Sequence, residues 1–94
     1  MNDDTKNSNQ ESPLEFPCNF PIKVMGATEG PFKEAIIEIV KKHIPDLKDE
    51  HIHERASSNN KYLSLTLTVY VTSREQLDAI YRELHASGHV LMSL

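Results

Sequence analysis

The stretch that most constrains the fold is KYLSLTLTVYV, residues 61–71, in which apolar and polar side chains alternate without a break. Alternation with a period of two residues predicts one long β-strand whose two faces differ in character. The apolar face is expected to pack on a core and holds Leu63, Leu65, Leu67, Val69 and Val71. The other face can remain in water and holds Tyr62, Ser64, Thr66, Thr68 and Tyr70. The sheet that contains this strand is therefore expected to be covered on one face only.

Two other segments have the pattern of strands. FPIKVM, residues 20–25, alternates and places Lys23 on its polar side, and GATEG, residues 26–30, is expected to break this strand. HVLMSL, residues 89–94, is expected to form the last strand.

Two segments have the pattern of helices. Apolar residues recur at helical spacing near 31–44, where Pro31 is placed at a first helical position, and again near 74–87. Ser73 and Gln76 have the spacing of a capping box at the start of the second helix, and Gly88 is placed to end it.

The charged segment DEHIHER, residues 49–55, could be a metal site, an acid–base cluster or a strand. Because the turn-forming residues SSNN follow it, we predict the second strand of a hairpin, lying at a sheet edge where charge discourages aggregation. On a strand, His51, His53 and Arg55 share one face, and Ile52 and Glu54 share the other. Two histidines two residues apart lack the further ligands that a zinc site needs, so no metal is expected.

The order β-α-β-β-α-β, with right-handed crossovers, predicts an α+β fold. It is the ferredoxin-like two-layer sandwich: a four-stranded antiparallel sheet in the order 4-1-3-2, with two helices on one face. Residues 13–94 are expected to form this single domain. Residues 1–12 have no apolar residue after Met1 and are predicted to be a disordered tail.

Charge and composition exclude several classes of protein. The net charge is −4 and no basic cluster is present, so nucleic acid is not an expected partner. The single cysteine, Cys18, cannot form an internal disulfide, and no apolar run approaches the roughly 20 residues that span a bilayer. We therefore expect a cytoplasmic protein that does not enter the membrane.

Candidate catalytic groups do not form a recognisable set. Cys18 lies in a proline-rich lead-in, where a small buried residue is expected rather than a reactive thiol. His43 is placed as a core-edge histidine or as a cation at a helix C-terminus. Glu34, Glu38 and Glu83 are predicted to lie on solvated helix faces. The sequence thus predicts no enzyme, no catalytic residue and no cofactor.

Two features remain as candidate sites. Backbone amides of the loop before the first helix can hold a small anion, which makes Gly26, Ala27, Thr28, Glu29 and Gly30 candidate ligand-binding residues. The uncovered sheet face is a candidate interaction surface, formed by Lys23, Tyr62, Ser64, Thr66, Thr68 and Tyr70. These features indicate a regulatory or protein-interaction module, whose partner is a protein or a small-molecule effector. Because Tyr62 and Tyr70 can stack on bases, an RNA-binding module is the alternative.

The block LEFPCNFPIKVMG, residues 14–26, the Y-x-S-x-T pattern at 62–66 and the terminal VLMSL resemble the YbeD-like family of small bacterial proteins of unknown function. The resemblance covers about residues 13–94. It implies the same βαββαβ fold, which is similar to ACT regulatory domains that bind amino acids. Ligands of ACT domains lie near the loop after the first strand, and residues 26–30 match that loop. The resemblance therefore implies a small-molecule sensor.

The predicted surfaces also bear on assembly. Hydroxyl groups on the uncovered face do not require burial, and a short charged edge strand is a poor template for sheet extension. We therefore expect a monomer in isolation.

Overall fold

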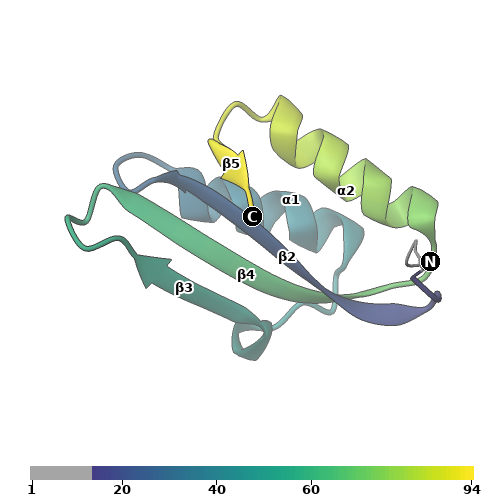
Figure 1. Ribbon diagram of the computed structural model, residues 1–94. Coiled ribbons are helices and arrows are strands. Elements are labelled where there is room, and N and C mark those ends of the chain that lie inside the picture. Colours follow the sequence, from purple (N-terminus) through teal and green to yellow (C-terminus); the bar gives the residue numbers. More distant parts are fainter. Residues whose placement is uncertain (1–13) are drawn as a thin grey trace, which may run out of the picture.

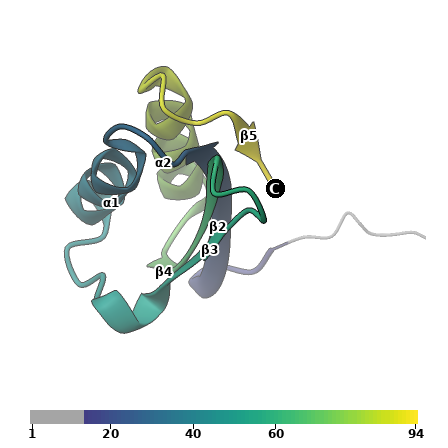
Figure 2. The same cartoon turned by 90° about the vertical axis from the view of Figure 1, so that its left-hand side faces the viewer.

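Helices and strands follow the order β-α-β-β-α-β in the computed structural model, which describes residues 14–94. The strands are β2 (Cys18–Ala27), β3 (Ile52–Ala56), β4 (Tyr62–Val71) and β5 (Met92–Ser93). The helices are α1 (Phe32–His43) and α2 (Arg74–Ala86), and a short 3-10 turn, η1 (Asp49–His51), precedes β3. The sheet lies in front of the helices in Figure 1, and Figure 2 shows both helices on one side of it. The predicted ferredoxin-like sandwich is confirmed.

The sheet has the strand order β3-β4-β2-β5, and every neighbouring pair is antiparallel. If the four strands are counted 1 to 4 along the chain and the sheet is followed from β5 to β3, this is the predicted order 4-1-3-2. Strand β2 pairs with β4 along its whole length, from Cys18 opposite Val71 to Ala27 opposite Tyr62. Strand β3 forms one edge, as predicted, and β5 pairs with only two residues of β2 on the other side. The two long central strands therefore determine the shape of the sheet.

The core follows from the alternation. The residues of β2 and β4 that point towards the helices include Ile22, Val24, Leu65 and Leu67, and each of these has no exposed surface. The helices contribute Phe32, Ile36 and Val40 from α1 and Leu77, Ile80 and Leu84 from α2. Burial of apolar area at roughly 25 cal/mol per Å² stabilises this arrangement, while the opposite sheet face needs no cover.

Three element boundaries differ from the prediction. Strand β2 includes both Cys18 and Gly26, so Cys18 is not in the lead-in and Gly26 does not break the strand. The residues Asp49–His51 form η1 and not a strand, because the Lys48 N–H donates to His51 Nδ1 at 3.2 Å and the His51 N–H donates to the Lys48 carbonyl at 2.9 Å. The last strand contains only Met92–Ser93.

The helix ends show how the sequence fixes the connections. The Ser73 hydroxyl accepts a hydrogen bond from the Gln76 N–H at 3.1 Å, as the predicted cap requires, but the Gln76 amide oxygen accepts from the Thr72 N–H at 2.8 Å. Gly88 follows α2 with φ of 80°, a conformation that favours glycine. Pro31 lies one position earlier than predicted, as the cap of α1.

The β5 side of β2 is only half covered. The carbonyls of Lys23 and Met25 accept hydrogen bonds from the N–H groups of Leu94 and Leu91 at 2.9 and 2.8 Å. Alternation directs the backbone of Pro21 to the same side, beyond the end of β5. Proline has no N–H to offer there, so this stretch is a poor template for another strand. The monomeric state itself stays a prediction.

Candidate functional site

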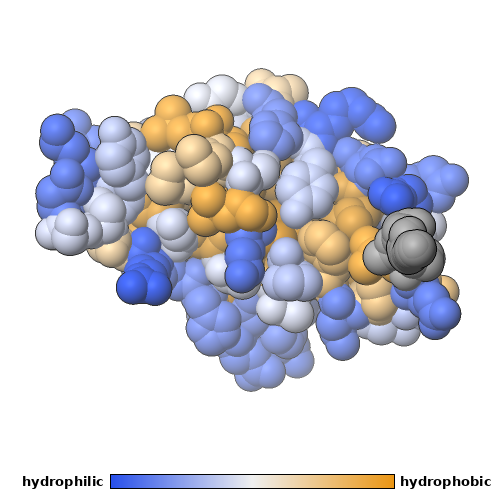
Figure 3. Space-filling model, in the orientation of Figure 1, coloured by the Kyte–Doolittle hydropathy of each residue, from blue (hydrophilic) through white to orange (hydrophobic). Residues whose placement is uncertain are grey.

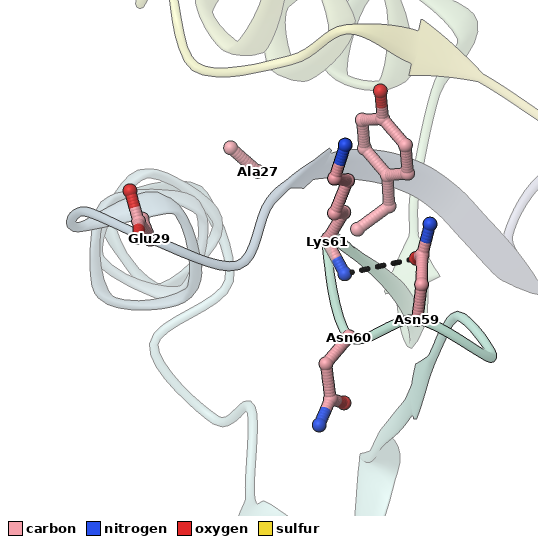
Figure 4. A pocket seen from close by; sticks show the side chains of 6 residues that line it. Ala27, Glu29, Asn59, Asn60 and Lys61 are labelled. Carbon is pink, nitrogen blue, oxygen red and sulfur yellow. Dashed lines mark hydrogen bonds between the residues drawn. The ribbon is translucent and has the colours of Figure 1, made fainter.

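An open hollow lies where the segment after β2 meets the turn between β3 and β4. It has a volume of about 460 Å³ and is lined by Ala27, Glu29, Asn59, Asn60, Lys61 and Tyr62. Figure 4 shows Glu29 on one side and Asn59 and Lys61 across from it. The volume falls within the range of roughly 300–1,000 Å³ that is usual for small-molecule sites.

The turn that forms one wall is held by its own polar side chains. Asn59 Oδ1 accepts hydrogen bonds from the Ser57 hydroxyl at 2.8 Å and from the Lys61 N–H at 3.1 Å. Asn60 has φ of 61°, a left-handed conformation that asparagine tolerates better than most residues. The Tyr62 N–H donates to the Ser57 hydroxyl at 3.1 Å. This wall is therefore fixed before any ligand binds.

The opposite wall includes only part of the predicted ligand loop. Among the residues 26–30, Ala27 and Glu29 line the hollow. The Thr28 N–H donates to the Lys61 carbonyl at 2.9 Å, which ties the loop to the turn but uses an amide that was expected to be free for an anion. Gly26 is buried against Phe32, and Gly30 has φ of 93° with open space around it. The two glycines therefore have structural roles.

Asn59, Asn60 and Lys61 line the hollow but were not predicted from the sequence as ligand-binding residues. A signal was present, since SSNN was identified as a turn and the hairpin strands were identified around it. The register of β2 with β4 then brings Ala27 opposite Tyr62 and so places the turn beside the loop. That register depends on pairing between residues far apart in the sequence.

The charges of the hollow are mixed. Glu29 supplies a carboxylate, Lys61 an ammonium group, and Asn59 and Asn60 supply amides, all on exposed residues. No histidine, cysteine or serine lines it. The hollow can therefore bind a small polar molecule, but it lacks a nucleophile paired with a base.

The six predicted residues of the interaction surface all lie on the uncovered face. Lys23 is opposite Thr66, and the exposed fractions of Tyr62 and Tyr70 are 41% and 55%. Because these tyrosines are eight positions apart on one strand, they are separated by roughly 26 Å at about 3.3 Å per residue. Neighbouring bases of one RNA segment cannot stack on both. The geometry therefore gives the RNA alternative little support.

Glu83 is not the simple solvated residue that was predicted. Its carboxylate bonds to the Lys42 ammonium group, and its Oε1 lies 2.8 Å from His43 Nε2. These contacts join α2 to the end of α1, where His43 was placed correctly. The hydrogen bond from Lys42, and then that from His43, hold the pKa of Glu83 below its ordinary value of 4.5.

We expect this cluster to make stability depend on acidity. A carboxyl group whose pKa is lower in the folded state stabilises the fold above the unfolded value of 4.5, and this contribution is lost as the pH falls through the lower folded value. Glu83→Gln should therefore be less stable than wild type in urea at pH 7, and the difference should shrink as the pH falls below 4.5. Glu38→Gln, on the exposed face of α1, is the matched control. A constant difference between wild type and Glu83→Gln at all pH values would contradict this account.

Two further groups have shifted pKa values outside the hollow. The hydrogen bond to Glu54, an ion pair between α1 and the edge strand, raises the pKa of Lys33. Burial raises the pKa of the Tyr81 phenol, whose ring packs between Phe20 and His85. The contacts of Lys33 with Glu54 and of Tyr81 with Phe20 each hold a helix against the sheet. Neither Lys33 nor Tyr81 lines the hollow.

The potential metal ligands of the charged segment do not converge. His51 lies in η1 and His53 in β3, and within residues 14–94 no group of three His, Cys, Asp or Glu side chains could hold a metal ion. Cys18 is half-buried against the core.

None of the described helices is long and apolar enough to cross a membrane.

Comparison with known proteins identifies the family. The model of a family described as "Protein of unknown function (DUF493)" matches residues 11–94. The chain belongs to the DUF493 family. One relative, UPF0250 protein NE1487 from Nitrosomonas europaea, is 46% identical over 85 residues, which span 90% of this chain and 98% of the relative. Another, a UPF0250 protein from Neisseria gonorrhoeae, is 48% identical over 90 residues, spanning 96% and 97%. The resemblance to small bacterial proteins of unknown function is thereby confirmed.

Solved structures of other proteins share the fold of this chain. Protein HP0495 from H. pylori is similar with a TM-score of 0.69 at 18% identity, covering 95% of this chain and 94% of that protein. The ACT domain from the GTP pyrophosphokinase of Chlorobium tepidum is similar with a TM-score of 0.63 at 16% identity, covering 82% and 97%. At these identities the likeness concerns the fold alone. The predicted ACT-like fold is confirmed, and nothing in these comparisons indicates catalysis.

Proposed function

We propose that this protein is a non-catalytic regulatory module that senses a small molecule carrying both an ammonium and a carboxylate group, as a free amino acid does. The observation that carries the proposal is the hollow, with Glu29 on one wall and Lys61 and Asn59 on the other. A carboxylate can accept from the ligand's ammonium group, while an ammonium group and an amide can donate to its carboxylate.

Two observations support a sensor. The wall formed by Asn59 and Lys61 is held by hydrogen bonds within the turn, so little ordering is needed on binding. The ACT-like fold also supports it, since the resemblance to ACT domains implies a ligand near the loop after the first strand, and Ala27 and Glu29 lie there. A sensor of free metabolites is consistent with the cytoplasmic location that we expect.

The test is an amide NMR titration of the full chain with individual free amino acids. Shift changes should cluster at Ala27–Glu29 and at residues 59–62. Removing one hydrogen bond to a charged group costs about 1.5–3 kcal/mol, so Glu29→Gln and Lys61→Gln should each weaken binding roughly tenfold or more.

The controls change the same residue types away from the hollow. Glu34→Gln and Lys41→Gln lie on exposed positions of α1 and should bind as wild type does. Absence of shifts for every amino acid at millimolar concentration would refute the proposal. Binding by Glu29→Gln and by Lys61→Gln with the affinity of wild type would refute it as well.

A further inference from the structure

We infer that the uncovered sheet face is a docking surface for an acidic, partly apolar segment of a partner protein. The surface, here called the basic face, comprises Lys23 on β2, His53 and Arg55 on β3 and the hydroxyl residues Ser64 and Thr66 between them on β4. It shares no residue with the hollow, so the inference goes beyond the proposed sensor and does not depend on it.

The register of the sheet brings these basic residues together. Lys23 and His53 lie opposite Thr66 from its two sides, and Arg55 lies opposite Ser64 in the next row of the same face. Strands are about 4.8 Å apart, so Lys23 and His53 lie roughly 10 Å apart across β4, and Lys23 and Arg55 lie roughly 12 Å apart on the diagonal. All three are exposed.

The basic face differs from the rest of the molecule in charge. The chain as a whole has a net charge of −4. On the four described strands, by contrast, the outward positions contain no aspartate or glutamate, because Glu54 faces the helix side and bonds to Lys33. A local excess of positive charge, bordered by half-buried hydroxyl groups, complements carboxylates of a partner.

Apolar side chains border the basic face near the C-terminus. Met92 on β5 is paired with Met25 on β2, and exposed Leu91 and Leu94 flank Met92. Figure 3, which views this face, shows apolar side chains gathered in the region where Figure 1 places β5. Exposed apolar groups beside polar ones mark protein contacts more often than isolated residues do. The partner segment should therefore carry apolar residues beside its acidic ones.

A protein segment fits this surface better than RNA does. The tyrosines are too far apart to stack neighbouring bases, and Lys23 and Arg55 offer few phosphate contacts against a net negative chain. An acidic peptide needs only local charge complementarity and the apolar border. A surface for acidic protein segments should bind an acidic peptide more tightly than RNA, and a surface for RNA should do the reverse.

The experiment compares three probes with the full-length protein. They are a synthetic glutamate-rich peptide with interspersed leucines, the same peptide with lysine in place of every glutamate, and single-stranded oligo-uridine. Fluorescence anisotropy should show salt-sensitive binding of the acidic peptide and much weaker binding of the other two. Amide NMR should place the shifts at Lys23, Arg55 and Thr66, and not at the hollow.

Charge reversal supplies the variants. Lys23→Glu with Arg55→Glu should weaken binding of the acidic peptide at least about tenfold, because attraction becomes repulsion. The matched control is Lys41→Glu with Arg82→Glu on exposed helix positions, which changes the net charge equally and should leave affinity within about twofold. The neutral variant Lys23→Gln with Arg55→Gln should lose an intermediate amount of affinity for the acidic peptide. It tests the inference even if the charge-reversed variant does not fold.

Three results would overturn the inference. Tighter binding of oligo-uridine than of the acidic peptide would overturn the inference in favour of nucleic acid. Equal losses in the two charge-reversed variants would show attraction by net charge alone and would also overturn it. Failure of the acidic peptide to bind would do the same, and would leave amino-acid binding at Glu29 and Lys61 as a separate result.

Discussion

Replacing Gly26 by alanine is expected to lower the free energy of unfolding by about 3 kcal/mol, because a new methyl group would overlap a buried ring. An ideal Cβ at Gly26 would lie 2.2 Å from Cδ1 and 2.5 Å from Cγ of Phe32. Cγ is the root of the ring, so the whole side chain of Phe32 must move, and it is only 2% exposed. Urea denaturation of the variant and the wild type measures this loss.

A double-mutant cycle identifies the cause. Phe32→Leu removes part of the ring, so Gly26→Ala should cost less in that background than in wild type. Gly30→Ala is the contrasting control, since no atom lies within 4 Å of its added methyl group and only the φ of 93° opposes it, at about 1–2 kcal/mol. A Gly26→Ala variant as stable as wild type would show that β2 and α1 do not pack in this way.

Leu65→Ala is expected to cost about 2–5 kcal/mol of stability, whereas Thr66→Ala, one residue further on, should cost about 1 kcal/mol or less. Leu65 has no exposed surface and lies in the middle of β4 against the helices. Truncation there removes apolar contacts and leaves a cavity. Thr66 points to the uncovered face, where its loss leaves no cavity.

Comparing the stability losses at Leu65 and Thr66 tests whether the side chains of β4 alternate between a buried and an uncovered face. Both variants can be measured by urea denaturation under one set of conditions, with the slope of the transition checked for two-state behaviour. Similar costs at Leu65 and Thr66 would contradict a strand with one buried face. Because domains of this size are stable by only about 5–15 kcal/mol, the loss at Leu65 should be plain.

The sites were predicted less completely than the fold. The uncovered face was found because a residue's side of a strand follows from its position alone, and all six of its residues lie there. Of the predicted ligand loop, only Ala27 and Glu29 line the hollow, because Gly26 and Ala27 continue β2 and the Thr28 amide is bonded to Lys61. Glu83 was placed on a solvated face because its partners, Lys42 and His43, belong to another helix.

Local sequence patterns were enough to predict the order of elements, the buried face of each and the positions of the helix ends at Ser73 and Gly88. These features depend on periodicity, capping and backbone freedom, which act between residues close together in the chain. Two further features appear only in the folded sheet: the β3–β4 turn borders the end of β2, and Arg55 and His53 lie across β4 from Lys23. The physical reason is strand register, which is fixed by hydrogen bonds and packing between distant segments, so a site shared by several strands exists only once they pair.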